Sequence, residues 1–94
     1  MLIFEWDSGK ARENELKHGV TFPEASELFG DDHSSSVPDP DHSAGEDRYL
    51  IFGISKQGRH LVVSYTERGE RIRLRRTNSI NLRSTDDFAG AKSL

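Results

Sequence analysis

The 94-residue sequence contains no cysteine, which excludes a disulfide framework and a thiolate metal site. No apolar run approaches the ~20 residues that a membrane-spanning helix needs. The apolar start, MLIFEW, is too short for a signal peptide and lacks its basic residues. With a mean hydropathy of -0.72, these absences predict a soluble, cytoplasmic protein. The length predicts one small domain, residues 1–94.

The charge is divided unevenly along the chain, although the net value is only -3. Residues 1–47 hold twelve acidic and three basic side chains, which gives -9, whereas residues 48–94 hold four acidic and ten basic, which gives +6. Such a division predicts a basic surface for an anionic ligand. Attraction between the two halves of the folded chain is the alternative explanation.

The first part of the chain predicts a strand and a helix. LIFEW (residues 2–6) is a short apolar run typical of a strand. Asp7 fits an N-cap for a helix from about Ser8 to His18, which ends on two basic residues followed by Gly19. This helix-ending chemistry accounts for much of the LKHG stretch without any function.

A second helix is predicted within residues 21–30. Thr21 and Glu24 match a capping box, Pro23 suits the first turn, and Gly30 ends the helix. The apolar side chains at helical spacing predict a core-facing side: Phe22, Ala25, Leu28 and Phe29.

The remainder predicts a sheet. A polar loop, with a short strand around Ser36–Val37, comes first. Three strands that form an antiparallel meander follow, within residues 48–55, 60–67 and 71–76. A weak helix is predicted from residue 84 onward. The fold class is therefore α+β, a small antiparallel sheet with two N-terminal helices and a weak C-terminal helix.

The strongest chemical signal is the stretch ERIRLRR. Strand alternation puts Arg71, Arg73 and Arg75 on one face, about 7 Å apart, and Ile72 and Leu74 on the other. A turn over residues 67–70 would place Thr66 opposite Arg71 and Ser64 opposite Arg73, and alternation would separate Arg75 from Arg76.

Nucleic-acid phosphate is the expected ligand of this arginine row, because guanidinium groups bind phosphate in a bidentate manner. Further arginines enlarge the patch: Arg59, Arg68, Arg76 and Arg83. The alternative is a solvated face balanced by the acidic half. The nuclease interpretation requires these cations to lie close together and not to be neutralised by carboxylates of the same chain.

Cleavage of RNA without metal needs a base for the 2′-hydroxyl, an acid for the 5′-oxygen and charge stabilisation. The candidate proton-transfer groups are His18, His42, Glu46 and His60, and Lys17 lies beside His18. The stretch DPDHSAGED resembles a calcium loop only at its start, since Ala44 and Leu50 occupy essential positions. No metal or other cofactor is therefore expected.

Three stretches together resemble the BrnT family of bacterial type II toxins: FEWDSGKARENELKHGVTFPEASELF, then D-x7-D-x-x-HSAGEDR, then GRHLVVSYTERGERIRL. The similarity runs from about Leu2 to Leu74. It implies a RelE-like fold and a metal-free ribonuclease that inhibits translation. It also implies a BrnA-type antitoxin that neutralises the toxin in a dimer of heterodimers and supplies DNA binding.

The resemblance and the arginine row together indicate the site residues. We expect catalytic roles for Arg68, Arg73, Lys17 and His18, and RNA binding by Lys10, Arg59, Arg71, Arg75 and Arg76. After Leu74 the sequence departs from the family pattern, with Arg76 and Asn78 in place of Ser and Arg. This leaves open an alternative, a catalytically degenerate homologue that binds its antitoxin and regulates the operon.

Overall fold

Helix α1 (Ser8–His18) has the bounds predicted from its capping residues, in a computed structural model that describes residues 2–43 and 45–80. Asp7 accepts a hydrogen bond from the backbone N–H of Lys10 at 2.8 Å. Gly19 adopts φ 68°, where a side chain would be strained, and its N–H donates to the carbonyl of Glu15.

Helix α2 (Phe22–Ser26) is shorter than predicted and continues as a 3-10 helix, η1 (Glu27–Gly30). Thr21 caps it by accepting from the N–H of Glu24 at 3.3 Å. The Glu24 carboxylate does not complete the predicted capping box. It accepts hydrogen bonds from Ser55 and Arg59, which lie on either side of the turn after the third strand.

Five strands form one sheet in the spatial order β1-β5-β4-β3-β2. Their bounds are Ile3–Glu5 (β1), Ser35–Pro38 (β2), Arg48–Ile54 (β3), His60–Arg68 (β4) and Arg71–Ser79 (β5). The predicted meander and short strand are confirmed, but the sheet is not wholly antiparallel, because β1 pairs with β5 in parallel. A 3-10 turn, η2 (Pro40–His42), lies between β2 and β3.

The β4–β5 register differs from the prediction. The connection is two residues long, with Gly69 at φ 64°, so Arg68 lies opposite Arg71 and Thr66 opposite Arg73. An irregularity then shifts the pairing, since Tyr65 faces Leu74 while Ser64 faces Arg76. Arg75 is the extra residue of this β-bulge.

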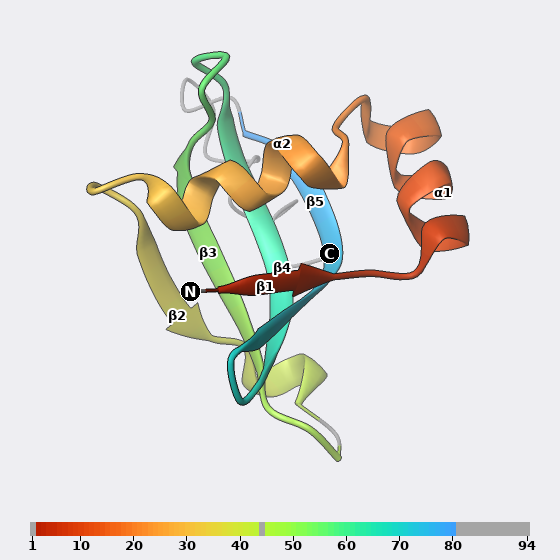
Figure 1. The fold of residues 1–94 in the computed structure, drawn as a ribbon, viewed down its shortest axis with the longest axis vertical. Helices are drawn as coiled ribbons and strands as arrows, with labels where there is room; N and C mark the ends of the chain where they lie inside the picture. The colour runs from red at the N-terminus through yellow and green to blue at the C-terminus, as the bar shows by residue number, and fades with distance from the viewer. Residues whose placement is uncertain (1, 44, 81–94) are drawn as a thin grey trace.

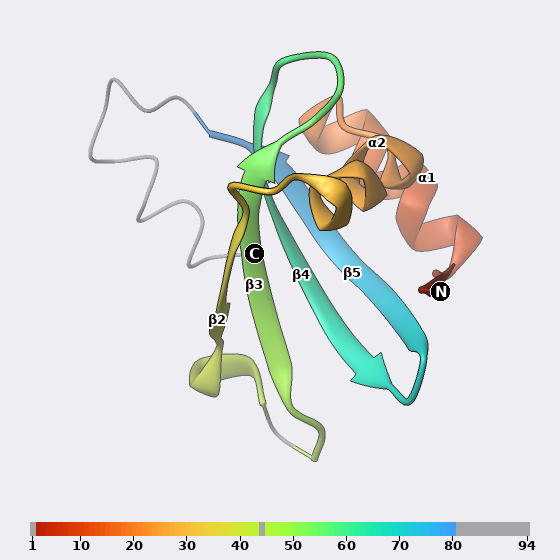
Figure 2. The same cartoon turned by 60° about the vertical axis from the view of Figure 1, so that its left-hand side comes forward.

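Both α-helices lie over the same face of the sheet, with α1 beside β5 and α2 across β4 and β5 (Figures 1 and 2). The core between α2, η1 and the strands includes the fully buried side chains of Phe22, Leu28, Leu61, Val63 and Leu74. Each contributes about 1.5–3 kcal/mol when removed from water. The same sheet face positions α1, which packs against β5.

The predicted C-terminal helix, from residue 84 onward, lies outside the described residues. No helix within residues 2–43 and 45–80 is long and apolar enough to span a bilayer.

Candidate functional site

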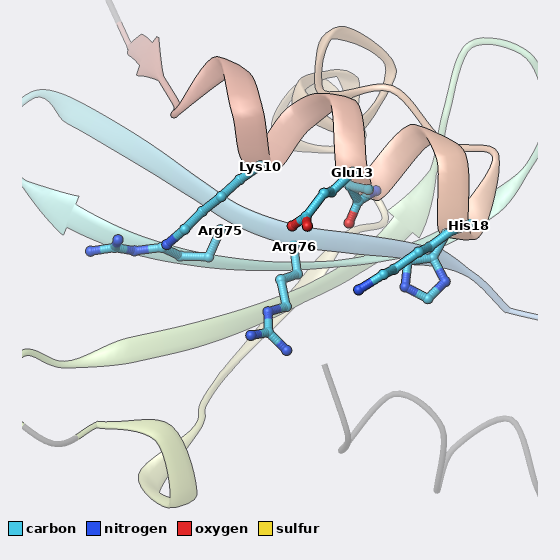
Figure 3. Close-up of a pocket in the computed structure, with 7 residues that line it drawn as sticks. Lys10, Glu13, His18, Arg75 and Arg76 are labelled. Atoms are coloured by element: carbon cyan, nitrogen blue, oxygen red, sulfur yellow. The ribbon is translucent and has the colours of Figure 1, made fainter.

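A cleft of about 160 Å³ lies between α1 and β5 (Figure 3). Five of its lining residues share one face of α1, at positions i, i+3, i+4, i+7 and i+8, and two come from β5. The lining residues are Lys10, Glu13, Asn14, Lys17, His18, Arg75 and Arg76. Cationic side chains outnumber carboxylates four to one among them, so the cleft attracts anions.

Asn14 fixes the helix to the sheet beneath the cleft. Its side chain is buried, its Nδ2 donates to the carbonyl of Val20 at 3.1 Å, and its Oδ1 accepts from the N–H of Thr77 at 3.0 Å. Both bonds involve buried polar groups that would otherwise lose their water partners, at a cost of about 1–3 kcal/mol each. Asn14 therefore holds the end of α1, with Lys17 and His18, against β5.

The β-bulge brings two consecutive arginines to the same cleft. Simple alternation predicts that Arg75 and Arg76 point to opposite faces of β5, and this prediction is wrong. Because Arg75 is the extra residue of the bulge, both side chains line the cleft. Figure 3 shows Lys10 and Arg75 extending toward one end of the cleft and His18 at the other.

Glu46 binds two arginines near the β4–β5 turn. Its carboxylate accepts from Arg68 Nε at 3.0 Å and from Arg75 Nη2 at 2.7 Å. The hydrogen bond from Arg68 is the main cause that lowers the pKa of Glu46, and it likewise raises the pKa of Arg68. A carboxylate engaged in this way is a weak proton acceptor.

The expectation of an unpaired arginine row is wrong. Arg73 pairs with Glu5 at 3.2 Å, Arg75 pairs with Glu46, and only Arg71 of the three has an exposed side chain without a carboxylate partner among the described residues. The shifted register and the bulge also break the even spacing on which the row depended. The row as such does not provide a continuous phosphate-binding surface.

Arg59 lies outside the cleft, in a clamp formed with Glu24 and Ser55. Its Nε donates to Glu24 at 2.9 Å, and its Nη2 donates to the carbonyl of Gly19 at 3.0 Å. The bond from Arg59 is the main cause that lowers the pKa of the buried Glu24 carboxyl. Since most of its donors are engaged, Arg59 serves to tie the β3–β4 turn to the α1–α2 connection.

Of the four candidate proton-transfer groups, only His18 lines the cleft. His42 bonds through Nδ1 to Asp39 at 2.8 Å in the η2 turn, and His60 is an exposed residue at the start of β4. Glu46 is engaged by its two arginines. Residues 2–43 and 45–80 contain no cluster of three or more metal-ligating side chains.

Glu13 and Asn14 are lining residues that we did not assign to the site from sequence, although both lie in the first of the three stretches that resemble the BrnT family. Their signal is periodicity: polar residues at 10, 13, 14, 17 and 18 form one stripe on a helix with almost no apolar face. A polar stripe that packs against a sheet requires either buried hydrogen bonds or a ligand. Asn14 supplies the former.

Comparison with known proteins identifies the family. The model of the family described as "Ribonuclease toxin, BrnT, of type II toxin-antitoxin system" matches residues 6–78, more than three-quarters of the chain. The chain belongs to the BrnT family. The match extends beyond Leu74 and includes residues 75–78 of β5, where the sequence was expected to depart from the family pattern.

Structural comparison agrees with membership of the BrnT family. The crystal structure of the Brucella abortus ribonuclease toxin, BrnT, has a TM-score of 0.68 with this chain at 17% sequence identity. The alignment covers 86% of this chain and 99% of that one. At this identity the likeness shows a shared fold. No curated protein matches the sequence.

Proposed function

We propose that this BrnT family member is a cytoplasmic, metal-independent endoribonuclease that inhibits translation by cutting RNA. The observation that carries the proposal is the cleft between α1 and β5, which His18 lines together with Lys10, Lys17, Arg75 and Arg76. Family membership supplies the ribonuclease class, and the cleft supplies a proton-transfer group beside cations.

The proposed chemistry is an internal transesterification. The ribose 2′-oxygen loses its proton and attacks the adjacent phosphorus, the bond from phosphorus to the 5′-oxygen breaks, and that oxygen receives a proton. His18 is assigned to one of these proton transfers. Lys17 stabilises the negative charge that develops on the phosphorane oxygens, because a cation in a confined site acts most strongly where charge develops.

The remaining proposed site residues bind the RNA backbone. Arg68 and Arg73 bind phosphate at the β4–β5 end, each through the N–H groups that its carboxylate partner leaves available. Lys10, Arg71, Arg75 and Arg76 are assigned to neighbouring phosphates. We assign Arg59 to the clamp with Glu24 instead.

The proposed partner is a BrnA-type antitoxin. A type II system includes a protein antitoxin, and an acidic segment laid over the basic cleft would block access to RNA. We propose that toxin and antitoxin form a dimer of heterodimers, and that only the antitoxin contacts DNA. We also propose that the toxin fold is RelE-like. Neutralisation is tested directly by mixing the purified toxin with such an antitoxin, which should suppress RNA cleavage.

Incubation of the purified protein with RNA, with and without EDTA, tests the nuclease proposal. We expect equal cleavage in both buffers and products that carry 2′,3′-cyclic phosphate and 5′-hydroxyl ends. Intact RNA in both buffers, together with normal growth of cells that express the chain alone, would contradict the proposal and favour the degenerate homologue. Loss of cleavage in EDTA alone would contradict metal independence.

A further inference from the structure

One carboxylate connects the two ends of the proposed RNA site. Arg68 is the last residue of β4, at the turn, whereas Arg75 lies in the β5 bulge and lines the cleft. Both guanidinium groups converge on Glu46, which lies outside the helix–strand framework in the segment between η2 and β3. Glu46 is therefore the shared partner of an arginine in the cleft and an arginine beyond it.

Arg75 depends on Glu46 for its direction. The Arg75 side chain is 14% exposed, and its Nε is buried without a hydrogen-bond partner among residues 2–43 and 45–80. Within those residues, the bond to Glu46 is the one ion pair that its guanidinium makes. A guanidinium largely withdrawn from water is costly to leave unpaired, so Glu46 determines which of its N–H groups stay available.

The segment that carries Glu46 is closed at its base by hydrogen bonds. The hydroxyl of Ser43 donates to the carbonyl of Asp39 at 2.7 Å and accepts from the N–H of Arg48 at 3.1 Å. The N–H of Asp39 donates to the carbonyl of Arg48 at 2.8 Å. These bonds join residues on both sides of Glu46 and so close the base of the segment that carries it.

We propose that Glu46 is a positioning residue, which orients Arg75 and Arg68 so that their remaining N–H groups face successive RNA phosphates. The proposal rests on the proposed nuclease function. An arginine has five N–H donors, and Glu46 occupies only part of each set. Two cations held by one carboxylate keep a net positive charge, so the group still attracts phosphate.

A competing role predicts the opposite effect. If Glu46 were only a substitute anion that RNA must displace, its removal would increase cleavage. The burial of the Arg75 side chain favours the positioning role, because displacement of Glu46 would leave a largely buried guanidinium without its ion pair and without a fixed orientation. The two roles are therefore distinguishable by the sign of the change in kcat.

The test compares Glu46→Gln with Glu67→Gln in steady-state cleavage of a short RNA. Glu67 is an exposed carboxylate of β4 with no ion pair among the described residues, so its variant removes the same charge near the same turn. For Glu46→Gln we expect kcat to fall roughly 10-fold or more with KM unchanged or lower, since misplaced arginines orient the phosphate poorly. Glu67→Gln keeps the wild-type kcat.

Arginine side-chain NMR provides a readout that does not depend on activity. We expect the Nε–H signals of Arg75 and Arg68 to shift and exchange faster with water in Glu46→Gln, but not in Glu67→Gln. Glu46→Asp, which keeps the charge and withdraws it by one methylene, should lower kcat as well. This variant carries the test if Glu46→Gln fails to fold.

The outcomes separate this inference from the nuclease proposal. A wild-type protein that cleaves RNA while Glu46→Gln cleaves equally well or faster overturns the positioning role alone. Unchanged Arg75 and Arg68 signals overturn it too. A wild-type protein that leaves RNA intact contradicts the nuclease proposal, whereas the NMR comparison still decides whether Glu46 orients the two arginines.

Discussion

The cleft on α1 and the clamp beside α2 use the same kinds of side chain with opposite results. In the clamp, the buried Glu24 carboxylate is matched by Arg59 and Ser55, and little donor capacity remains. In the cleft, Glu13 makes no ion pair with any described residue, and the surrounding cations outnumber it. Matched charges stabilise a fold, whereas Lys10 and Lys17, which line the cleft and form no ion pair with the described residues, keep their charge available to a ligand.

The largest effect on cleavage is expected from a substitution in the cleft. His18→Ala should lower kcat about 10²- to 10⁴-fold, the range typical of a lost general acid or base. The melting temperature should change little, because the His18 side chain is exposed. The pH–rate profile should lose one limb.

His60→Ala is the matched control for that experiment, since His60 is an exposed histidine on β4 outside the cleft. It should retain both the rate and the profile. A His18→Ala profile that superimposes on the wild-type one would remove His18 from proton transfer.

The clamp should show the complementary behaviour, a change in stability without a change in chemistry. Glu24→Gln leaves Arg59 without its charged partner and should lower the free energy of unfolding by about 1–3 kcal/mol, less than for a fully buried pair because Arg59 is 37% exposed. Chemical denaturation measures this change. Per folded molecule, RNA cleavage should remain as in the wild type.

The pH dependence of stability sharpens the same prediction. Arg59 lowers the pKa of folded Glu24 below the ordinary value of 4.5, so the pair stabilises the fold above that pH and the contribution is lost as the pH falls through the folded pKa. Denaturation of wild type and Glu24→Gln should therefore differ at pH 7 and converge in acid. A constant difference between pH 7 and pH 3 would contradict this account.

The salt dependence of RNA binding distinguishes Lys17 in the cleft from Arg59 in the clamp. Lys17→Ala should reduce the slope of log K against log salt concentration for single-stranded RNA by about 0.7, the value for one lost phosphate contact. Arg59→Gln should leave the slope unchanged, because its charge is already matched by Glu24. Equal reductions in both variants would place Arg59 in the RNA interface after all.

The smallest effect concerns the helix caps. Asp7→Ala and Thr21→Ala each remove an N-cap acceptor and should cost about 1 kcal/mol in thermal or chemical unfolding. Only Asp7→Ala should also reduce cleavage, since α1 carries the cleft and α2 does not. Equal cleavage by the two variants would show that the position of α1 is uncritical.

Much of the fold was predictable because local signals agree with the tertiary structure. Asp7 and Gly19 set both ends of α1, and the bounds of β3 and β4 follow their apolar runs to within one residue. The parallel pairing of β1 with β5 was not predictable, because no local feature of a three-residue strand shows which neighbour it joins. The predicted capping box failed at Glu24 because Arg59 and Ser55 bind its carboxylate.

The site was less predictable because it depends on register. Alternation treats β5 as regular, whereas the bulge at Arg75 reverses which residues share a face. The ion pairs of Glu5 and Glu46 join segments more than twenty residues apart, which composition cannot reveal. The arginine row therefore no longer supports the nuclease proposal; family membership and the α1–β5 cleft do.

The most direct test of the account maps a non-cleavable single-stranded RNA, with 2′-O-methyl riboses, onto the protein by NMR. We expect the shifted amide and side-chain signals to include those of Lys10, Lys17, His18, Arg75 and Arg76. Signals of Glu24, Ser55 and Arg59 should stay in place. Shifts confined to the clamp, or absent from the cleft at saturating RNA, would contradict the claim that the cleft is the RNA site.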